Sequence, residues 1–235
     1  MIEAHKLAKR YGRVEALQDV SFKIRKGTIT AMLGENGAGK TTTLKIALGF
    51  LRPDAGSVAI APGRVGYVPD RPAFPAGLDG WTILGLCRNR ERAGGEGNGR
   101  SFAAAVLGAS RSLLFDPGLL RRAPGAYSAG NAKKFAFLQN LVLAPDLLVA
   151  DEPYAALDPP AVKCVRDIFC GLRDAGKTVL ISSHMLAEME RIADGFVVLR
   201  RGRTIVHAGL REWRLLRASR TGPDLESVFL LLSGP

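Results

Sequence analysis

The sequence predicts an α/β protein with a mostly parallel β-sheet, an N-terminal antiparallel β layer and an inserted α-helical segment. The parallel sheet is indicated by residues 147–150, a continuous apolar run typical of a strand buried on both faces, and by the helix–strand units that follow it. The antiparallel layer is indicated by alternating apolar and polar positions over residues 1–28. A glycine-rich stretch, residues 34–42, joins a short apolar strand to a helix.

The remaining elements follow from hydrophobic spacing and from turn residues. Residues 29–33 form the apolar strand before the glycine-rich stretch, and apolar positions at helical spacing extend to residue 51. A Pro- and Gly-containing turn at 52–56 then ends this helix. Beyond the turn we expect strands at 57–60, 65–68, 147–150, 178–182 and 196–200, and helices at 128–143, 160–174 and 185–193.

A loop formed by Pro69, Pro72, Pro75 and Gly77 leads into the insertion. Within it the spacing predicts helices at 78–90, 101–107 and 117–122, with a flexible polar spacer at 94–99. We therefore interpret the chain as a single domain, 1–235. Its core with the β layer comprises 1–71 and 128–235, its α-helical subdomain comprises 72–127, and a C-terminal helical tail comprises 210–235.

Composition restricts the partners of this protein. Of its 235 residues, 47% are hydrophobic and 23% are charged, which is typical of a well-cored globular protein. No apolar run approaches the roughly 20 residues that span a bilayer, and no apolar segment near the N-terminus predicts a secretory signal. The net charge of +11 favours polyanionic partners, namely nucleic acid, an anionic membrane surface or acidic segments of another subunit.

Residues 34–42 read GENGAGKTT and match G-x-x-x-x-G-K-[ST], the phosphate-binding P-loop pattern. Glycines let backbone N–H groups turn toward phosphate oxygens, and the following helix N-terminus adds a favourable dipole. Lys40 can reach the β- and γ-phosphates, and the Thr41 hydroxyl can bind Mg²⁺. The motif predicts a P-loop NTPase core that binds a nucleoside triphosphate through Gly34, Asn36, Gly37, Gly39, Lys40, Thr41 and Thr42.

A second motif, Asp151-Glu152, follows the buried strand at 147–150. The strand places Asp151 at the carboxyl edge of the sheet, where ligands of α/β proteins bind, and its carboxylate suits a Mg²⁺ ligand. The adjacent Glu152 can polarise an attacking water molecule as a general base. Beside a P-loop, this pair indicates hydrolysis of the bound triphosphate.

The order of these motifs resembles the ATP-binding subunit, or nucleotide-binding domain, of ABC transporters over nearly the full length of the chain. The resemblance implies that Tyr11 stacks on adenine, although a tyrosine of a β layer can also pack in the core. It implies that Asp151 binds Mg²⁺ and that Glu152 is the general base. It implies that Asp158 belongs to the D-loop and that His184 contacts the γ-phosphate and the attacking water. Lys40, Glu152 and His184 are therefore the expected catalytic residues.

Two motifs depart from the family pattern. The signature L-S-G-G-Q corresponds to residues 127–131, YSAGN, which retain Ser128 and Gly130 but replace a glycine by Ala129 and the glutamine by Asn131. The alanine methyl matters if the backbone needs a positive φ or very close phosphate approach, and Ser128 is equally a normal helix N-cap. At the Q-loop, Asp70 stands for Gln or Glu; it can reach Mg²⁺ through water, or be a plain loop aspartate.

The stretch 224–230, DLESVFL, resembles the ending of ATPases of ABC-2-type exporters. The resemblance implies an ATP- and Mg²⁺-dependent ATPase that forms a homodimer or heterodimer around two ATP molecules and powers a separate membrane permease. Such a subunit is cytoplasmic and peripheral on the inner face of the cell membrane, where a basic surface suits anionic lipid.

Two alternatives remain for the function. The charge of +11 also suits a soluble ABC-type ATPase that acts on nucleic acid or ribosomes. Neither the second fused ATPase module nor the long coiled-coil insertion of those relatives is present, which makes nucleic acid an unlikely partner. The departures at Ala129, Asn131 and Asp70 suit a weakly hydrolysing partner in a heterodimer.

Overall fold

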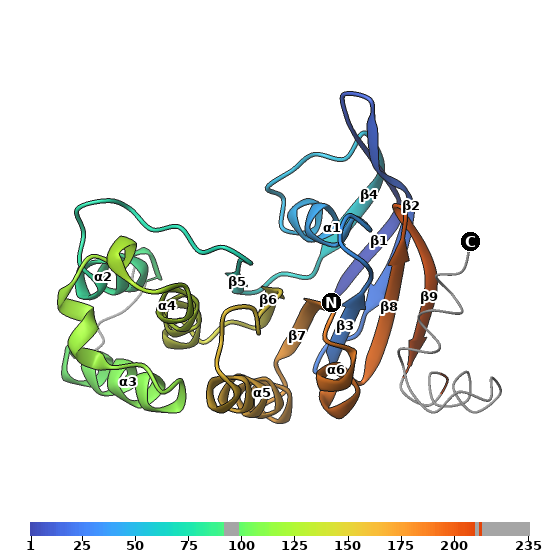
Figure 1. Ribbon diagram of the computed structural model, residues 1–235. Coiled ribbons are helices and arrows are strands. Elements are labelled where there is room, and N and C mark those ends of the chain that lie inside the picture. The colour runs from blue at the N-terminus through green and yellow to red at the C-terminus, as the bar shows by residue number, and fades with distance from the viewer. Residues whose placement is uncertain (92–98, 210–211, 213–235) are drawn as a thin grey trace. The chain divides into compact units, whose positions relative to one another are not determined.

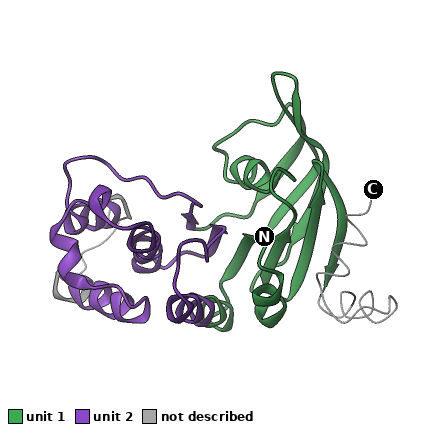
Figure 2. Cartoon of the chain, in the orientation of Figure 1, with its two compact units in different colours: residues 1–63, 169–235 green, residues 64–168 purple. Residues whose placement is uncertain are grey.

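A computed structural model describes residues 1–91, 99–209 and 212 of the chain. The chain divides into two compact units, residues 1–63 with 169–235 (unit 1) and residues 64–168 (unit 2), as Figure 2 shows. The predicted α-helical subdomain belongs to unit 2, together with residues 64–71 and 128–168. Within the described part of the chain, no helix combines the length and the apolar character needed to cross a membrane.

Unit 1 contains a sheet with the strand order β4-β1-β2-β9-β8-β3-β7 (Figure 1). Its antiparallel part pairs β1 with β2 and with β4, and its parallel part pairs β3 with β7 and with β8. The strands are β1 (Ile2–Tyr11), β2 (Val14–Ile24), β3 (Ile29–Leu33), β4 (Ala55–Ile60), β7 (Thr178–Ser183), β8 (Gly195–Arg200) and β9 (Arg203–Gly209). The sheet therefore has the predicted N-terminal antiparallel layer and parallel core.

Strand β9 was not predicted from the sequence. It pairs antiparallel with β8 after a turn at Arg201 and Gly202. Its residues alternate between exposed and less exposed positions, so its apolar pattern is weak. Both turn residues have a positive φ, and Gly202 is the residue in the sequence that could have indicated a hairpin turn.

The helices of unit 1 pack on this sheet. Helix α1 (Lys40–Ala47) contacts β1, β2 and β4, and helix α6 (Leu186–Ile192) contacts β3. Helix α1 ends earlier than the predicted residue 51, because the amides of Phe50 and Leu51 fold back onto the carbonyl of Lys45. Helix α5 (Pro159–Asp174) begins in unit 2 and ends in unit 1.

Unit 2 joins a short parallel strand pair to a group of helices. Strand β5 (Val65–Val68) runs parallel to β6 (Leu147–Asp151), whose residues are all buried as the continuous apolar run predicted. Helix α4 (Ala129–Val142) lies at the centre, because it contacts β5 and both α2 (Gly80–Glu91) and α3 (Gly99–Ser112).

The helix predicted at 117–122 is a 3₁₀ turn, η1 (Pro117–Arg121), followed by a second one, η2 (Pro124–Ala126). The side chain of Asp116 accepts a hydrogen bond from the Gly118 amide at the start of η1, and proline at 124 prevents the turn from continuing as an α-helix. The predicted tail at 210–235, apart from residue 212, and most of the predicted spacer at 94–99 lie outside the described residues.

An aromatic cluster holds the N-terminal end of α4 in unit 2. The ring centroid of Phe135 lies 5.1 Å from that of Phe74 and 5.7 Å from that of Tyr127, in edge-to-face geometry. The Tyr127 hydroxyl donates a hydrogen bond of 2.7 Å to the carbonyl of Leu119. Ring packing and this hydrogen bond therefore fix Tyr127, the first residue of the stretch 127–131.

Candidate functional site

The glycine-rich stretch of unit 1 leads from β3 into the N-terminus of α1. Gly37 and Gly39 have φ values of 84° and 103°, in the left-handed region that glycine adopts without strain. Gly39 is the N-cap residue of α1 and offers no side-chain hydrogen bond to the first turn. The first amides of α1 therefore have no side-chain cap at this position, which suits an anionic ligand.

The same loop rests directly on backbone of neighbouring strands. A Cβ at Gly34 would lie 2.6 Å from the carbonyl oxygen of Leu199, and one at Gly39 would lie 2.9 Å from the carbonyl oxygen of Ala16. The amide of Gly202 donates a hydrogen bond of 3.1 Å to the carbonyl of Ala38. The loop is thus held between β2 and the β8–β9 turn by close contacts and by this hydrogen bond.

Lys40, the first residue of α1, is buried against this loop. Its Nζ donates hydrogen bonds of 2.7 Å to the carbonyl of Gly34 and 3.2 Å to that of Glu35. The ammonium group therefore lies over the loop, while Asn36, Gly37 and Thr41 are exposed beside it. This arrangement of a cation, turned amides and a helix N-terminus fits a polyphosphate.

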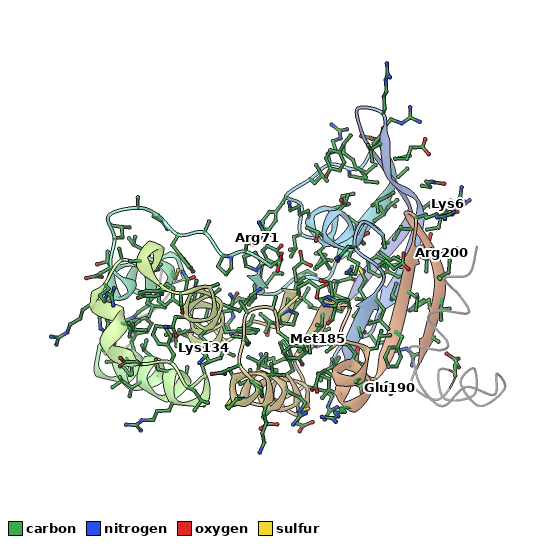
Figure 3. The ribbon with its side chains drawn as sticks, viewed as in Figure 1. Lys6, Arg71, Lys134, Met185, Glu190 and Arg200 are labelled. Carbon is green, nitrogen blue, oxygen red and sulfur yellow. The ribbon has the colours of Figure 1, made fainter. Side chains whose placement is uncertain are left out.

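Two further predicted residues belong to unit 1. Leu33 pairs with Ser183 in the parallel ladder of β3 and β7, so Gly34 and His184 leave the sheet at the same edge. His184 is exposed at this position. It immediately precedes Met185, the N-cap residue of α6, whose side chain is labelled in Figure 3. Tyr11 ends β1 in the hairpin with β2 and is 48% exposed. Packing of Tyr11 in the core is therefore wrong, and its ring is accessible for stacking.

A second set of predicted residues lies together in unit 2. Val68 pairs with Ala150 in the parallel ladder of β5 and β6, so residues 69–70 and 151–152 follow the same edge of this strand pair. Asp151 is 1% exposed at the end of β6, whereas the Asp70 side chain is 44% exposed. Glu152 has a φ of 44°, a left-handed conformation that is uncommon for a residue with a Cβ.

Sequence reasoning missed Lys133, which joins these two segments. Its Nζ donates to the carbonyls of Asp70 (2.6 Å), Pro69 (2.9 Å) and Glu152 (3.1 Å) and lies 3.5 Å from that of Asp151. Burial lowers the pKa of its ammonium to about 8, against the opposing effect of three nearby carboxylates. Its signal in the sequence is a lysine one helical turn before the buried Ala136 and Phe137 of α4.

The signature stretch begins α4, also in unit 2. Ser128 is its N-cap, and the Ser128 hydroxyl accepts a hydrogen bond of 3.3 Å from the amide of Asn131. Ala129 is the first helical residue and has no positive φ, so its methyl group meets no backbone strain. A Cβ at Gly130 would lie 2.8 Å from the carbonyl oxygen of Ala156. Glycine is therefore needed at position 130 and not at 129.

Gly130 thus brings the start of α4 against the loop that contains Asp158. The Asp158 carboxylate accepts a hydrogen bond of 3.0 Å from the amide of Ala161 and caps the first turn of α5. Asp158, Ser128 and Ala129 are all exposed. The predicted site residues consequently form two groups, one in each unit: Tyr11, Gly34, Asn36, Gly37, Gly39, Lys40, Thr41, Thr42 and His184 in unit 1, and Asp70, Ser128, Gly130, Asp151, Glu152 and Asp158 in unit 2.

Known proteins are similar to this chain both in sequence and in fold. Residues 17–155 match the sequence model of the family described as "ABC transporter". The bacitracin transport ATP-binding protein BcrA of Enterococcus faecalis is 30% identical over 224 residues, which cover 90% of this chain and 70% of that protein.

Two solved structures extend the comparison to the fold. One, an ATP-binding subunit of an ABC transporter, is 26% identical with a TM-score of 0.88 over 100% of both chains. The other is a dimeric ATP-binding cassette, MJ0796, in a post-hydrolysis state bound to ADP and Pi. It is 21% identical, with a TM-score of 0.80 over 90% of this chain and 99% of that one. With the family match over more than half of its length, the chain belongs to the ABC transporter family and is an ABC ATPase domain.

Proposed function

We propose that this protein binds and hydrolyses ATP as a subunit that dimerises around two ATP molecules and powers export through a separate membrane permease. The observation that carries the proposal is the P-loop of unit 1, where Lys40 lies over left-handed Gly37 and Gly39 at the uncapped start of α1. This geometry offers a positive charge and several backbone donors to a triphosphate, and little to an uncharged ligand.

The phosphate chain of ATP would bind along the P-loop residues already named. The Lys40 ammonium would exchange its bonds to the Gly34 and Glu35 carbonyls for the β- and γ-phosphates. The adenine ring would stack on Tyr11, whose exposed side chain supports this role. Thr42, at the start of α1 beside Thr41, would add a phosphate contact.

The donor set for Mg²⁺ consists of oxygen atoms, as this cation prefers. Thr41 would contribute its exposed hydroxyl, Asp151 its carboxylate at the end of β6, and Asp70 its half-exposed carboxylate, through water. When bound, Mg²⁺ would neutralise charge that develops on the transferred phosphoryl group.

Hydrolysis requires that water be activated and directed at the γ-phosphorus. We assign activation to the Glu152 carboxylate as a general base, next to the metal ligand Asp151. We assign to His184 a hydrogen bond to the γ-phosphate and the water, which its position at the sheet edge following β7 supports.

Dimerisation would complete each site with residues of the partner. The signature stretch supports this because Ser128 and Ala129 are exposed, and Gly130 lies against Ala156 in the loop that contains the exposed Asp158. Ser128 and Gly130 of one subunit would then contact the γ-phosphate bound to the other, across an interface lined by Asp158. The MJ0796 cassette is dimeric in its post-hydrolysis state, which supports dimerisation of this chain. Whether the partner is a second copy or a related chain does not alter this chemistry.

The membrane partner is inferred from a relative. The name of BcrA states transport of bacitracin, which supports a transporter as the assembly in which this chain works. We propose that the chain sits at the cytoplasmic face of the membrane, bound to the permease. Its net charge of +11 would favour the anionic inner leaflet there.

The decisive experiment replaces the proposed base. Glu152→Gln removes the negative charge and keeps the shape, so we expect turnover to fall more than about 100-fold while ATP drives a stable dimer. Light scattering after size exclusion would show a doubled mass with ATP and not with ADP. Glu190→Gln on α6, labelled in Figure 3, is the matched control and should behave as wild type. Unchanged turnover in Glu152→Gln would remove Glu152 from its role.

The high positive charge supports one second candidate, an ABC-type ATPase that acts on nucleic acid. Affinity purification from membranes distinguishes the two functions. A co-purifying integral membrane protein supports the permease, whereas co-purifying RNA or DNA that is lost with rising salt supports the alternative.

A further inference from the structure

Lys133 is the most completely buried ammonium group among the described residues of unit 2, with 1% of its surface exposed. An ammonium group carries three N–H donors. The Asp151 carbonyl oxygen lies 3.5 Å from Nζ, and three carbonyl oxygens lie closer. They belong to Asp70 at 2.6 Å, Pro69 at 2.9 Å and Glu152 at 3.1 Å. The donors of this side chain are therefore saturated by main-chain acceptors from other segments.

Nearby carboxylates favour the charged form of Lys133, but they do not satisfy its N–H donors. The nearest carboxylate contact is Asp70 Oδ1 at 3.9 Å, longer than each of the three carbonyl contacts, and the Asp70 side chain is 44% exposed. Burial of an ammonium group is costly unless hydrogen bonds satisfy it, and here carbonyls do so. The position of the Lys133 ammonium group is thus set by main-chain carbonyls at the ends of β5 and β6.

The three carbonyls come from the two segments that follow the β5–β6 strand pair. Residues 69–70 belong to the Q-loop, and Glu152 follows Asp151 at the end of β6. Lys133 itself lies on α4, one turn after the signature residues Ser128 and Gly130. A single side chain consequently connects the backbones of three motifs within one unit.

We propose that Lys133 is a positioning residue that fixes the main chain of Glu152 and of the Q-loop to the signature helix α4. This inference rests on the proposed function, because it takes Glu152 as the general base. Lys133 does not contact the reacting atoms; it acts through the Glu152 peptide.

The backbone conformation of Glu152 makes its hydrogen bond with Lys133 important. Its φ of 44° is unfavourable for a residue with a Cβ, so the peptide must be held by its surroundings. The hydrogen bond from Lys133 to the Glu152 carbonyl holds the peptide group that joins Glu152 to the next residue. Without it, the residue can relax toward a negative φ, and the carboxylate direction changes with the backbone.

The consequence for catalysis is specific. Small displacements of a general base reduce turnover strongly, whereas the P-loop of unit 1 binds the nucleotide through other residues. Loss of the Lys133 bonds should therefore lower kcat and leave ATP affinity nearly unchanged.

Lys134 provides a matched control on the same helix. Its Nζ donates a hydrogen bond of 3.1 Å to the carbonyl of Leu114, and Figure 3 labels this neighbour of Lys133. Lys134→Met and Lys133→Met remove the same charge and the same number of donors from adjacent positions. They differ in whether the carbonyls of residues 69–70 and 152 lose their donor.

The test compares Lys133→Met, Lys133→Arg and Lys134→Met in the full-length protein. For Lys133→Met we expect kcat to fall at least about tenfold, with the dissociation constant of a fluorescent ATP analogue within about threefold of wild type. Arginine keeps the charge and donors, so Lys133→Arg should recover part of kcat. Amide hydrogen exchange without nucleotide should accelerate at residues 70, 71, 151, 152 and 154 in Lys133→Met, and not in Lys134→Met.

Three results would overturn the proposal: a kcat of Lys133→Met equal to that of Lys134→Met, an equal loss of affinity and turnover, or unchanged exchange at both segments. If Lys133→Met does not fold, Lys133→Arg carries the test, since its planar guanidinium cannot reproduce the same three bonds; a wild-type kcat in that variant overturns the proposal. Failure of the wild type to bind ATP would instead refute the proposed function, and the nucleotide-free exchange measurement still decides whether Lys133 holds the two segments.

Discussion

Lys40 in unit 1 and Lys133 in unit 2 are both buried lysines that donate hydrogen bonds to backbone carbonyls, yet they differ in where those carbonyls come from. Lys40 contacts Gly34 and Glu35, within its own loop, six and five residues away. Lys133 contacts Pro69, Asp70 and Glu152, which lie 64, 63 and 19 residues away in the chain.

The difference separates a ligand-binding cation from a positioning cation. The contacts of Lys40 to its own loop can be exchanged for a phosphate without disconnecting distant parts of the chain. The contacts of Lys133 cannot be exchanged without releasing the segments that carry Asp70 and Glu152. Substitution at Lys40 should therefore act on affinity, and substitution at Lys133 on turnover.

The largest effect is expected for Lys40→Ala. Removal of the cation that would bind the β- and γ-phosphates should weaken ATP binding at least about 100-fold, which fluorescence titration with a labelled ATP analogue would measure. Lys45→Ala, an exposed lysine on the same helix, is the control and should bind as wild type. Wild-type affinity in Lys40→Ala would show that Lys40 does not bind the nucleotide. It would also contradict the distinction between Lys40, which acts on affinity, and Lys133, which acts on turnover.

Gly39→Ala should be next, and its effect is on stability. The added Cβ would lie 2.9 Å from the backbone carbonyl oxygen of Ala16 at a φ of 103°, so we expect the free energy of unfolding to fall by about 2 to 3 kcal/mol. Gly37→Ala shares a positive φ but meets no atom within 4 Å, and should cost about 1 kcal/mol. Urea denaturation of both variants would measure the difference in unfolding free energy. An equal loss in the two variants would show that close contact at Gly39 does not determine the loop conformation.

Gly130→Ala applies the same reasoning to unit 2. Its Cβ would lie 2.8 Å from the Ala156 carbonyl oxygen, which should cost about 1 to 2 kcal/mol of stability and separate the signature stretch from the loop containing Asp158. Gly125→Ala, where no atom lies within 4 Å, is the control. Thermal unfolding and ATP-dependent dimerisation would be measured together, and an unchanged melting temperature in Gly130→Ala would contradict the contact.

The smallest effect is expected for Ala129→Gly, which restores the family residue. Because Ala129 has no positive φ, the glycine relieves no strain, and kcat should stay within about twofold of wild type. Stability should fall by up to about 1 kcal/mol, because glycine is a poor helix residue. A severalfold rise in kcat, measured by phosphate release, would support the alternative of a weakly hydrolysing subunit whose signature limits turnover.

The elements that could be predicted from sequence are those whose signal is local. The P-loop residues 34–42 are contiguous, and the buried run 147–150 identifies a strand by itself, so both were found and placed on the correct elements. The weakly patterned β9 and the 3₁₀ turn η1 were missed or assigned to the wrong helix type, because their conformations depend on pairing with β8 and on the Asp116 cap.

Sequence alone determined the P-loop, the Asp151-Glu152 pair, the family resemblance and the mostly parallel α/β fold, since each rests on residue types at short, fixed spacings. Tertiary structure alone decided that glycine is needed at Gly130 and not at Ala129, and that Lys133 joins the Q-loop to Glu152. These features depend on atoms from segments distant in the chain that approach within about 3 Å, and the spacing of residues in a sequence carries no such distance.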